Sequence, residues 1–490
     1  MKKYIFYVAA ITTLSITACR KIETDGEPII ITVPGGGGGG TSGKTVILKD
    51  HITKDTTLKA IDNNTISGFV YVDAGVTLTI EKGATVKGDY AASSASTLII
   101  KRGAKLMAIG TADAPIVFTS SSPTPASGDW GGIVLLGKAS INAKNGGNPA
   151  LYIPEGGFNN AAGDGLAGWG DAVAPAAVDN DNSGVLQYLR IEYAGNAFLP
   201  NQEINSLTMA AVGSGTIIDH IQVSYAKDDA FEWFGGTVNC KYLIAYKTQD
   251  DDFDTDNGYS GSVQFGLIIR DSAIADVSKS ESFESDNDAQ GSALTPQTKA
   301  VFSNVTSFGP LATPNNVGNS NYLGAAVQIR RNSSLSIFNS AFVGWSTGIL
   351  LDAGLGTPTD LNYAGGTGAL KLSGILLVSC KTPLAYTAST TAPTGYSAAT
   401  FTTDFLANTK NKILTQTTEQ AIYTRPFDYV SPDFIPFGNS AVVIPTASNN
   451  YFDDPVIAAR TFIKKVDFIG GIAPSGVDAS WHKGWTKYSK

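Results

Sequence analysis

The chain has 490 residues, of which 43% are hydrophobic and 16% are charged, with 53 glycines and a formal net charge of −8. The low charge and the high glycine content exclude a coiled coil, a helical bundle and a disordered chain, while the hydrophobic content is enough for a large core. The acidic balance argues against nucleic acid and anionic membrane surfaces as partners.

The first residues read as a targeting segment. A short basic start is followed by an apolar run from Tyr4 to Thr17, which is too short to span a bilayer because a helix needs about 20 residues for that. The run ends in Ile16-Thr17-Ala18-Cys19, which resembles a bacterial lipobox. That resemblance implies cleavage before Cys19 and lipidation of its sulfur. The alternative is an ordinary signal peptide followed by an incidental cysteine. We therefore expect a lipoprotein signal peptide over residues 1–18.

Residues 19–43 are predicted to be a flexible tether, because Arg20–Glu27 is polar and Gly35 to Gly40 is an unbroken glycine run. Glu23, Asp25 and Glu27 follow the cysteine and resemble the surface-export signal of Bacteroidota lipoproteins. This resemblance implies a protein anchored in the outer membrane and exposed at the cell surface. Residues 38–45 also match GxxxxGK[ST], but a strand is expected after them rather than a helix, so we interpret the match as a by-product of the glycines.

From residue 44 to about 380, short β-like runs recur, each bounded by Gly, Asn, Asp or Ser. Leu189–Tyr193, Ile221–Tyr225 and Tyr242–Tyr246 are three of them, and their alternation has a period of two. Repeats of about 20 residues with one β-rich unit each are the signature of a solenoid, and a parallel β-helix fits best. A sandwich or barrel is the alternative, but tight two-residue turns are few.

We therefore expect an all-β fold, with a parallel β-helix over residues 44–430. Tyr193, Tyr225 and Tyr246 should form one ladder of stacked side chains across its turns. A solenoid needs caps on its exposed ends. The aromatic-rich stretch 431–490 is predicted to be the closing cap.

The stretches Gly110–Ser120 and Gly128–Ile133 resemble right-handed parallel β-helix proteins of the pectin-lyase-like superfamily. More closely, the chain resembles a group of Bacteroidota surface lipoproteins whose biochemical role is mostly unassigned. The resemblance covers roughly residues 44–490 and is specific for the fold. It is weak for activity, because a fold does not fix a function.

An acidic block is the main functional clue. Residues 228–288 contain 14 acidic and 4 basic residues, a net of −10 against −8 for the whole chain. Phe231–Gly236 aligns with Phe253–Gly258 and then with Phe283–Asp288, at offsets of 22 and 30. In a β-helix these segments would stack. Carboxylates about 5 Å apart are costly unless a cation bridges them, and calcium is the obvious cation outside cells. The predicted calcium ligands form two ladders, Glu232, Asp254 and Glu284 in the first and Asp256 and Asp286 in the second.

Two partial calcium-loop patterns have a simpler explanation. Asp179–Gly184 matches the first half of an EF-type loop, but Arg190 stands where a bidentate Glu belongs. Asp252, Asp254 and Asp256 also alternate, although the following glycine is one position late. Neither stretch is an EF-hand, and for Asp179–Gly184 we favour an Asp/Asn/Gly turn.

Histidine, cysteine and aromatic residues are further candidates for a role. His220 lies on the strand leading into the block, and we favour a satisfied strand histidine over a catalytic one. Cys240 and Cys380 lack CxxC spacing, so buried free thiols are expected, with a disulfide as the alternative. Trp233 and Phe234 could stack on a sugar ring as a ligand-binding pair, or belong to the core.

Two functions from different classes follow. The first is a non-catalytic envelope protein that binds a glycan, a peptide or an outer-membrane uptake partner, stabilised by calcium. The second is an enzyme acting on acidic polysaccharide. Lyases that resemble this fold use calcium with an Arg or Lys base, and hydrolases use paired Asp residues. Candidates for the base are Lys227, Lys247, Arg270, Arg330 and Arg331, and for the pair Asp228-Asp229 or Asp250-Asp251.

Overall fold

The computed structural model describes residues 43–143, 150–199, 202–310, 324–414, 422–426, 428, 431–438, 440–444 and 450–489. The predicted signal peptide, the tether and Cys19 lie outside these residues. Across the described ranges, no helix has both the length and the apolar character to cross a membrane.

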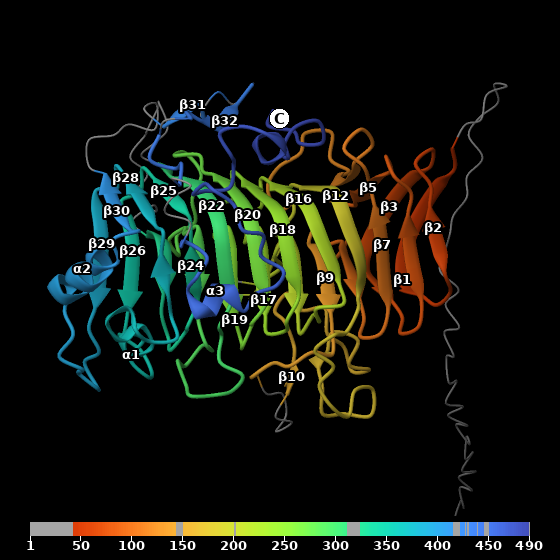
Figure 1. Cartoon of the computed structure of the whole chain (residues 1–490). Coiled ribbons are helices and arrows are strands. Elements are labelled where there is room, and N and C mark those ends of the chain that lie inside the picture. Colours follow the sequence, from red (N-terminus) through yellow and green to blue (C-terminus); the bar gives the residue numbers. More distant parts are fainter. Residues whose placement is uncertain are drawn as a thin grey trace, which may run out of the picture.

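The chain coils into a right-handed parallel β-helix, as the sequence predicted (Figure 1). Each coil contributes to three parallel sheets in the order sheet I, sheet II, sheet III, and each strand pairs with the equivalent strand of the next coil. The first coils form one end of the solenoid and the last coils form the other (Figure 1). Because every strand is paired on both sides except at the two ends, the solenoid exposes few free strand edges.

The three sheets share seven bent strands that contribute one half to each of two sheets. Sheet I consists of the second halves of β1 (Thr45–Ile52) and β3 (Asn63–Val72), then β6 (Thr97–Ile100), β9 (Gly132–Leu136), β15 (Leu207–Ala210), β17 (Phe231–Phe234), β19 (Phe253–Asp256), β21 (Phe283–Ser285), β23 (Ala325–Ile329), β26 (Thr347–Asp352) and β29 (Thr382–Thr387). Sheet II consists of β2 (Thr56–Leu58), β4 (Thr77–Ile80), β7 (Lys105–Ile109), the first halves of β12 (Gly184–Glu192), β16 (Ile217–Ser224), β18 (Asn239–Tyr246), β20 (Ser262–Ile269) and β22 (Val301–Phe308), then β24 (Ser336–Phe338) and β27 (Leu372–Ser373). Sheet III consists of the first halves of β1 and β3, then β5 (Thr85–Gly88), β8 (Ile116–Ser120), the second halves of β12 to β22 in the same order, β25 (Ala341–Val343), β28 (Leu376–Val378) and β30 (Lys412–Leu414).

The interior is filled by the inward half of each period-two alternation. In β6 and β9, Leu98, Ile100 and Ile133 point into the main core, whereas Ile99 and Val134 belong to a separate apolar cluster on the outer face of sheet I. That outer cluster is covered by an excursion of the chain (residues 150–183) that carries the short pair β10 (Leu151–Tyr152) and β11 (Ala167–Gly168). A second small pair, β13 (Ala197–Leu199) and β14 (Gln202–Glu203), precedes β15.

The bend between sheets II and III puts one residue per coil into the left-handed region. His220 has φ 57° and its ring stacks between Tyr188 and Tyr242, with centroids 4.3 Å from each. Phe265 continues the same stack beyond Tyr242 at 5.0 Å. A left-handed bulky residue is strained, and it persists only where the surrounding structure stabilises it. Here the stacked rings supply that stabilisation.

The predicted tyrosine ladder is confirmed in part. The rings of Tyr193 and Tyr225 stack at 5.2 Å with an interplanar angle of 6°. Tyr246 instead pairs in register with Ser224, one position before Tyr225, and meets the Tyr225 ring edge-on at 5.7 Å. The third ring therefore contacts the ladder from the side.

The C-terminal segment (residues 450–489) does not close the end of the solenoid as expected. It runs back along the outside of the bend between sheets II and III, from later coils to earlier ones (Figure 1). Side chains of successive coils donate to its carbonyls: Asn339 to Tyr451, Asn304 to Phe468, Gln264 to Lys464, Gln222 to Lys487 and Arg190 to Trp485. The aromatic residues of this segment cover the stack of rings at the bend.

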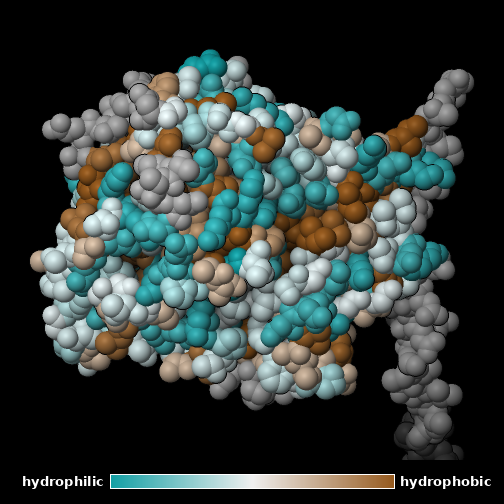
Figure 2. All heavy atoms as spheres, in the orientation of Figure 1, coloured by the Kyte–Doolittle hydropathy of each residue, from teal (hydrophilic) through white to brown (hydrophobic). Residues whose placement is uncertain are grey.

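The remaining elements lie at the C-terminal end of the solenoid or outside it. Helix α2 (Ala398–Ala407) begins with Ser397 as its N-cap and buries Phe401 and Phe405 against the last coils, so it covers the core there. The other short elements are α1 (Asp360–Tyr363), α3 (Pro455–Ala458), and the antiparallel pair β31 (Tyr423–Arg425) and β32 (Asp433–Pro436). On the face seen in Figure 2, hydrophobic residues form separate groups among hydrophilic ones rather than one continuous apolar face.

Trp485 tests how much the C-terminal segment stabilises the fold. Its ring is 0% exposed and packs edge-on against Tyr188 at 5.8 Å and His220 at 5.7 Å. Trp485→Ala is expected to lower the free energy of unfolding in urea by about 3–5 kcal/mol, as for other buried aromatic residues. Val477→Ala, at a side chain that is 79% exposed in the same segment, should change it by less than about 0.5 kcal/mol. Equal, small effects would show that the segment contributes little stability.

Candidate metal centre

One column of residues on the outer face of sheet I changes character along the solenoid. Strand pairing aligns Val134, Thr208, Glu232, Asp254, Glu284, Gln328 and Leu350 in that order. The first predicted carboxylate ladder is therefore in register. Successive coils are about 4.8 Å apart, so these three side chains lie much closer together than free carboxylates would.

A second column lies two residues further along each strand. Phe234 pairs with Asp256, and Asp286 follows directly after the position that pairs with Thr255, which places Asp256 and Asp286 on neighbouring coils. The turns that enter the same strands carry further acids. We define the acidic patch as these ten residues: Asp228, Asp229, Glu232, Asp250, Asp251, Asp254, Asp256, Glu281, Glu284 and Asp286.

The turn acids also help to hold the coils together. The Asp229 carboxylate accepts from the backbone N–H of Asp251 at 2.8 Å, and the Asp251 carboxylate accepts from the N–H of Glu281 at 2.5 Å. Aspartate favours such side-chain-to-backbone bonds in turns. One oxygen of each of these two carboxylates thus serves the fold.

Oxygens of the acidic patch converge in three groups, of which the first two share Asp229. One oxygen from each member lies within 4.8 Å of the others in the sets Asp228, Asp229 and Asp250; Asp229, Glu232 and Asp254; and Asp251, Glu281 and Glu284. Glu281 is 2% exposed, and its Oε1 has no hydrogen-bond partner. Gly324 gives this carboxylate room, because a Cβ there would lie 2.4 Å from Oε1. A buried oxygen without a partner is costly and calls for a ligand.

Burial and mutual repulsion raise the pKa of the carboxyls in these three groups and of Asp256. Burial is the largest cause throughout, and the charge of a neighbouring acid adds to it, bringing the pKa of Asp256 to about 8, of Glu281 to about 8 and of Asp250 to about 7. The pKa values of Asp229 and Asp254 lie well above the ordinary range for the same two reasons. Two like charges about 5 Å apart repel by about 3 kcal/mol at an effective dielectric constant near 20. At neutral pH the patch therefore needs either protons or cations.

Two further acids, Glu155 and Glu203, lie near Asp228 at the N-terminal side of the patch, and neutral and basic side chains contact the patch at both ends. Asn205 donates to Glu232 at the N-terminal side, where Tyr152 of the excursion lies 4.9 Å from Phe234. At the C-terminal side, Arg330 donates to both Glu284 and Asp286, and Arg331 donates to Asp286 at 2.7 Å. Two arginines cannot neutralise ten carboxylates.

The donor set fits a hard divalent cation. The patch offers carboxylate oxygens in groups of three with no sulfur or imidazole, which is the chemistry that calcium prefers. The orphaned Oε1 of Glu281 is an independent sign that a ligand belongs there. Residues of the Asp251, Glu281 and Glu284 group and of the Asp229, Glu232 and Asp254 group would hold it.

Sequence reasoning missed three members of the metal set, although a signal was present. Asp229, Asp251 and Glu281 each stand three residues before a ladder acid. The spacing Asp229-x-x-Glu232 recurs as Asp251-x-x-Asp254 and Glu281-x-x-Glu284. An acid that keeps the same offset in three repeats has to stack in the solenoid just as the ladder does.

The expected sugar-stacking residues do not face solvent. Trp233 is 0% exposed and points into the solenoid, where its ring stacks on Tyr259 at 5.4 Å. Phe234 is 4% exposed and lies beneath Tyr152. This arrangement is a correction to the ligand-binding prediction, because neither ring offers a face to a sugar. Alternation explains it, since residues 231 and 233 share the inward face.

Two of the candidate bases lie away from a substrate-accessible position. Arg270 is 0% exposed and pairs with Asp252 at 3.1 Å inside the turn. Lys247 pairs with Asp271 at 2.9 Å beyond the end of a sheet III strand. Arg330 and Arg331, at 22% and 29% side-chain exposure, are the candidate bases that contact the patch.

The other polar groups that the sequence singled out have structural partners. His220 lies in the aromatic stack at the bend and pairs with Asp219, so the satisfied-histidine interpretation fits. Asp179 accepts from the N–H of Ser140 at 2.8 Å, and Asp181 pairs with Lys138 at 3.2 Å, as a turn would. Cys240 and Cys380 are free and buried, which confirms the thiol interpretation, and burial raises the pKa of Cys380 to about 11.

A second group of potential metal ligands is already neutralised. His51, Asp73 and Asp164 converge on the first coils, but Lys101 Nζ lies 2.9 Å from Asp73 and 2.5 Å from Asp164. The lysine supplies the positive charge that these two acids need. This group therefore fixes the excursion, through Asp164, onto the solenoid.

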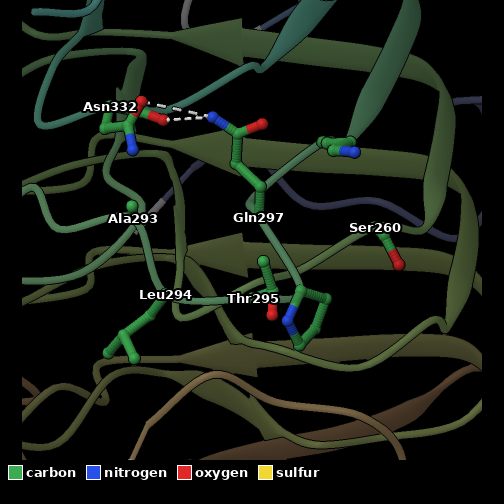
Figure 3. A pocket seen from close by; sticks show the side chains of 8 residues that line it. Ser260, Ala293, Leu294, Thr295, Gln297 and Asn332 are labelled. Carbon is green, nitrogen blue, oxygen red and sulfur yellow. Dashed lines mark hydrogen bonds between the residues drawn. The ribbon is translucent and has the colours of Figure 1, made fainter. Parts of the chain in front are cut away.

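A surface recess of about 450 Å³ lies on the turn after the patch strands, lined by Ser260, Ala293, Leu294, Thr295, Pro296, Gln297, Lys299 and Asn332. Figure 3 shows Gln297 reaching toward Asn332 across it, with a hydrogen bond of 2.8 Å from Nε2 to the Asn332 carbonyl. None of its lining residues is acidic. The recess is therefore a separate feature from the acidic patch.

Together, three parallel sheets and an acidic outer column define a right-handed parallel β-helix protein with a candidate cation site. The sequence model of one family, described as a pectate-lyase-like beta helix domain, matches residues 50–421. Because this match spans more than half of the 490 residues, the chain belongs to that family. No curated protein and no solved structure matched. The family accounts for the fold and leaves the ligand open.

The raised pKa values predict how stability depends on pH. These carboxyls bind protons more tightly in the folded state than in the unfolded state. Their contribution to the free energy of unfolding is therefore fully present below about pH 4. It is lost as the pH rises through 7 to 8, the folded-state pKa values of Asp250 and Asp256. In EDTA, the melting temperature should fall between pH 5 and pH 8. Saturating calcium should restore it at pH 8 and have little effect at pH 5. A melting temperature that does not change with pH or calcium would contradict this.

Proposed function

We propose that this chain is a cell-envelope lipoprotein whose β-helix binds calcium in the acidic patch and, with it, an extracellular ligand. The ligand is a glycan or an outer-membrane uptake partner. Bound calcium would neutralise the stacked carboxylates and present positive charge toward an acidic group of the ligand. The lipid anchor at Cys19 and the location at the outer-membrane surface follow from the leader and tether in the sequence.

One observation carries the calcium proposal. Carboxylate oxygens of Asp251, Glu281 and Glu284 come within 4.8 Å of one another, and the buried Oε1 of Glu281 has no protein partner. An acidic group that served only solubility would be exposed and dispersed. These acids are stacked by the register of the coils, so a cation is the simplest compensation for their charge.

The second candidate function is a calcium-dependent polysaccharide lyase, supported by the position of Arg330 beside the patch. A lyase of that kind needs a base in its deprotonated form, so that the base can take a proton from the substrate. Burial alone would lower the pKa of Arg330, but the charges of Glu284 and Asp286 outweigh it and raise the pKa above the ordinary value. The guanidinium is thus held in its protonated form, so we rank the lyase second.

A glycoside hydrolase is supported less. The carboxylates of Asp228, Asp229 and Asp250 approach within 4.8 Å, whereas catalytic pairs stand about 5–9.5 Å apart to accommodate the sugar and a water molecule. Asp228 and Asp229 are also buried. This spacing favours a shared cation over a catalytic pair.

The calcium site is tested by Asp254→Asn. Removing one charged ligand should weaken calcium binding by about tenfold or more, measured by calorimetry on chelator-treated protein. The melting temperature in EDTA should not fall, because the change also removes one of several crowded like charges.

The matched control for that experiment is Asp453→Asn. Asp453 is 59% exposed and pairs with Lys465 at 3.4 Å. This variant loses the same charge and should bind calcium like the wild type. Unchanged affinity in Asp254→Asn would refute the ladder, and a wild type that binds no calcium at millimolar concentration would refute the proposed function.

The anchor is tested separately. Cys19→Ala removes the sulfur that lipidation requires, so the protein should leave the membrane fraction and appear in the soluble fraction after cell fractionation. Cys380→Ala, at a buried thiol of the solenoid, is the control and should stay in the membrane fraction. Retention of the Cys19→Ala variant would sink the lipoprotein proposal.

A further inference from the structure

Arg330 stands where the acidic column would continue. Its backbone N–H donates to the carbonyl of Ser285 at 3.0 Å, which stacks it on Asp286 in the coil before. The second outer column of sheet I therefore runs Phe234, Asp256, Asp286, Arg330. The sequence of charges ends in a cation that the chain itself supplies.

The guanidinium makes contacts of the kind that a bound ion would make. Its Nε lies 2.9 Å from Asp286 Oδ1 and its Nη2 lies 3.1 Å from Asp286 Oδ2, while Nη2 also donates to Glu284. Glu284 thereby contacts both Arg330 and one of the groups of converging carboxylates. Its carboxylate accepts from Arg330 and also belongs to the group with Asp251 and Glu281. The buried Oε1 of Glu281 lacks a partner.

We propose that Arg330 is a built-in cation of the acidic patch, which occupies the place of a divalent ion between Glu284 and Asp286. This inference rests on the proposed function, because it assumes that the remaining carboxylates hold calcium. The wild-type patch then binds one ion fewer than it would bind without the arginine. Without the arginine, Glu284 and Asp286 lose this cation and become available to one more ion.

The experiment compares the wild type with Arg330→Gln by two measurements. Calorimetry with calcium alone gives the number of ions bound per chain, and thermal unfolding gives stability in EDTA and in millimolar calcium. We expect Arg330→Gln to bind one more calcium ion than the wild type. It should melt lower than the wild type in EDTA, since Glu284 and Asp286 lose their partner, and should regain the wild-type melting temperature in calcium.

The matched control is Arg425→Gln, which removes the same charge from a side chain that is 56% exposed and lies outside the solenoid. It should bind the same number of ions as the wild type. Its melting temperature should equal that of the wild type in EDTA and again in calcium. An unchanged ion number in Arg330→Gln would overturn the inference. So would a lower melting temperature, or failure to fold, that calcium does not correct, because a purely structural arginine has no ionic substitute.

The same data separate the two proposals. If the wild type binds calcium and Arg330→Gln binds no additional ion, this inference fails and the proposed function stands. If the wild type binds no calcium, the proposed function fails, and this inference fails with it because it assumes that the remaining carboxylates hold calcium. If neither protein binds calcium, both fail.

Discussion

The register of the stacked coils is the constraint on which the rest of this structure depends. Parallel backbone pairing holds successive coils about 4.8 Å apart and brings equivalent residues into contact. For Leu, Ile and Phe this builds the core, and for Tyr193 and Tyr225 it builds a stack of rings. For Glu232, Asp254 and Glu284 it enforces an approach that their charges oppose. The backbone cannot relax that repulsion without losing its hydrogen bonds, so the compensation has to come from protons or cations.

The acids occupy a bounded stretch of one sheet face. Before them in the same column lie Val134 and Thr208, and after them lie Gln328 and Leu350. The preceding outer face is apolar and covered by the excursion, and Tyr152 of the excursion also reaches the first acids of the patch. This column thus changes from apolar to acidic within two coils, and the change is local. It is poorly explained as a general surface charge.

Much of this could be predicted from the sequence, because a solenoid turns sequence offsets into contacts. The offsets of 22 and 30 residues gave the pairing of Glu232 with Asp254 and with Glu284 correctly. The sequence alone could not show whether Trp233 or Phe234 faces solvent. Every residue of Phe231–Phe234 is buried, because the excursion covers the outer side of this strand. The contact of Arg330 with the acidic patch could not be predicted, for another reason. Its contact with Asp286 spans 44 residues across a coil of irregular length.

The C-terminal segment has a consequence for how the solenoid unfolds. In a simple solenoid each coil touches only its neighbours, so coils can fray one at a time from either end. Here one segment is hydrogen-bonded to coils as far apart as those of Arg190 and Asn339. Opening any coil between them breaks contacts with a segment that the other coils share. The middle of the solenoid, which carries the carboxylates, therefore forms one cooperative unit that opens as a whole.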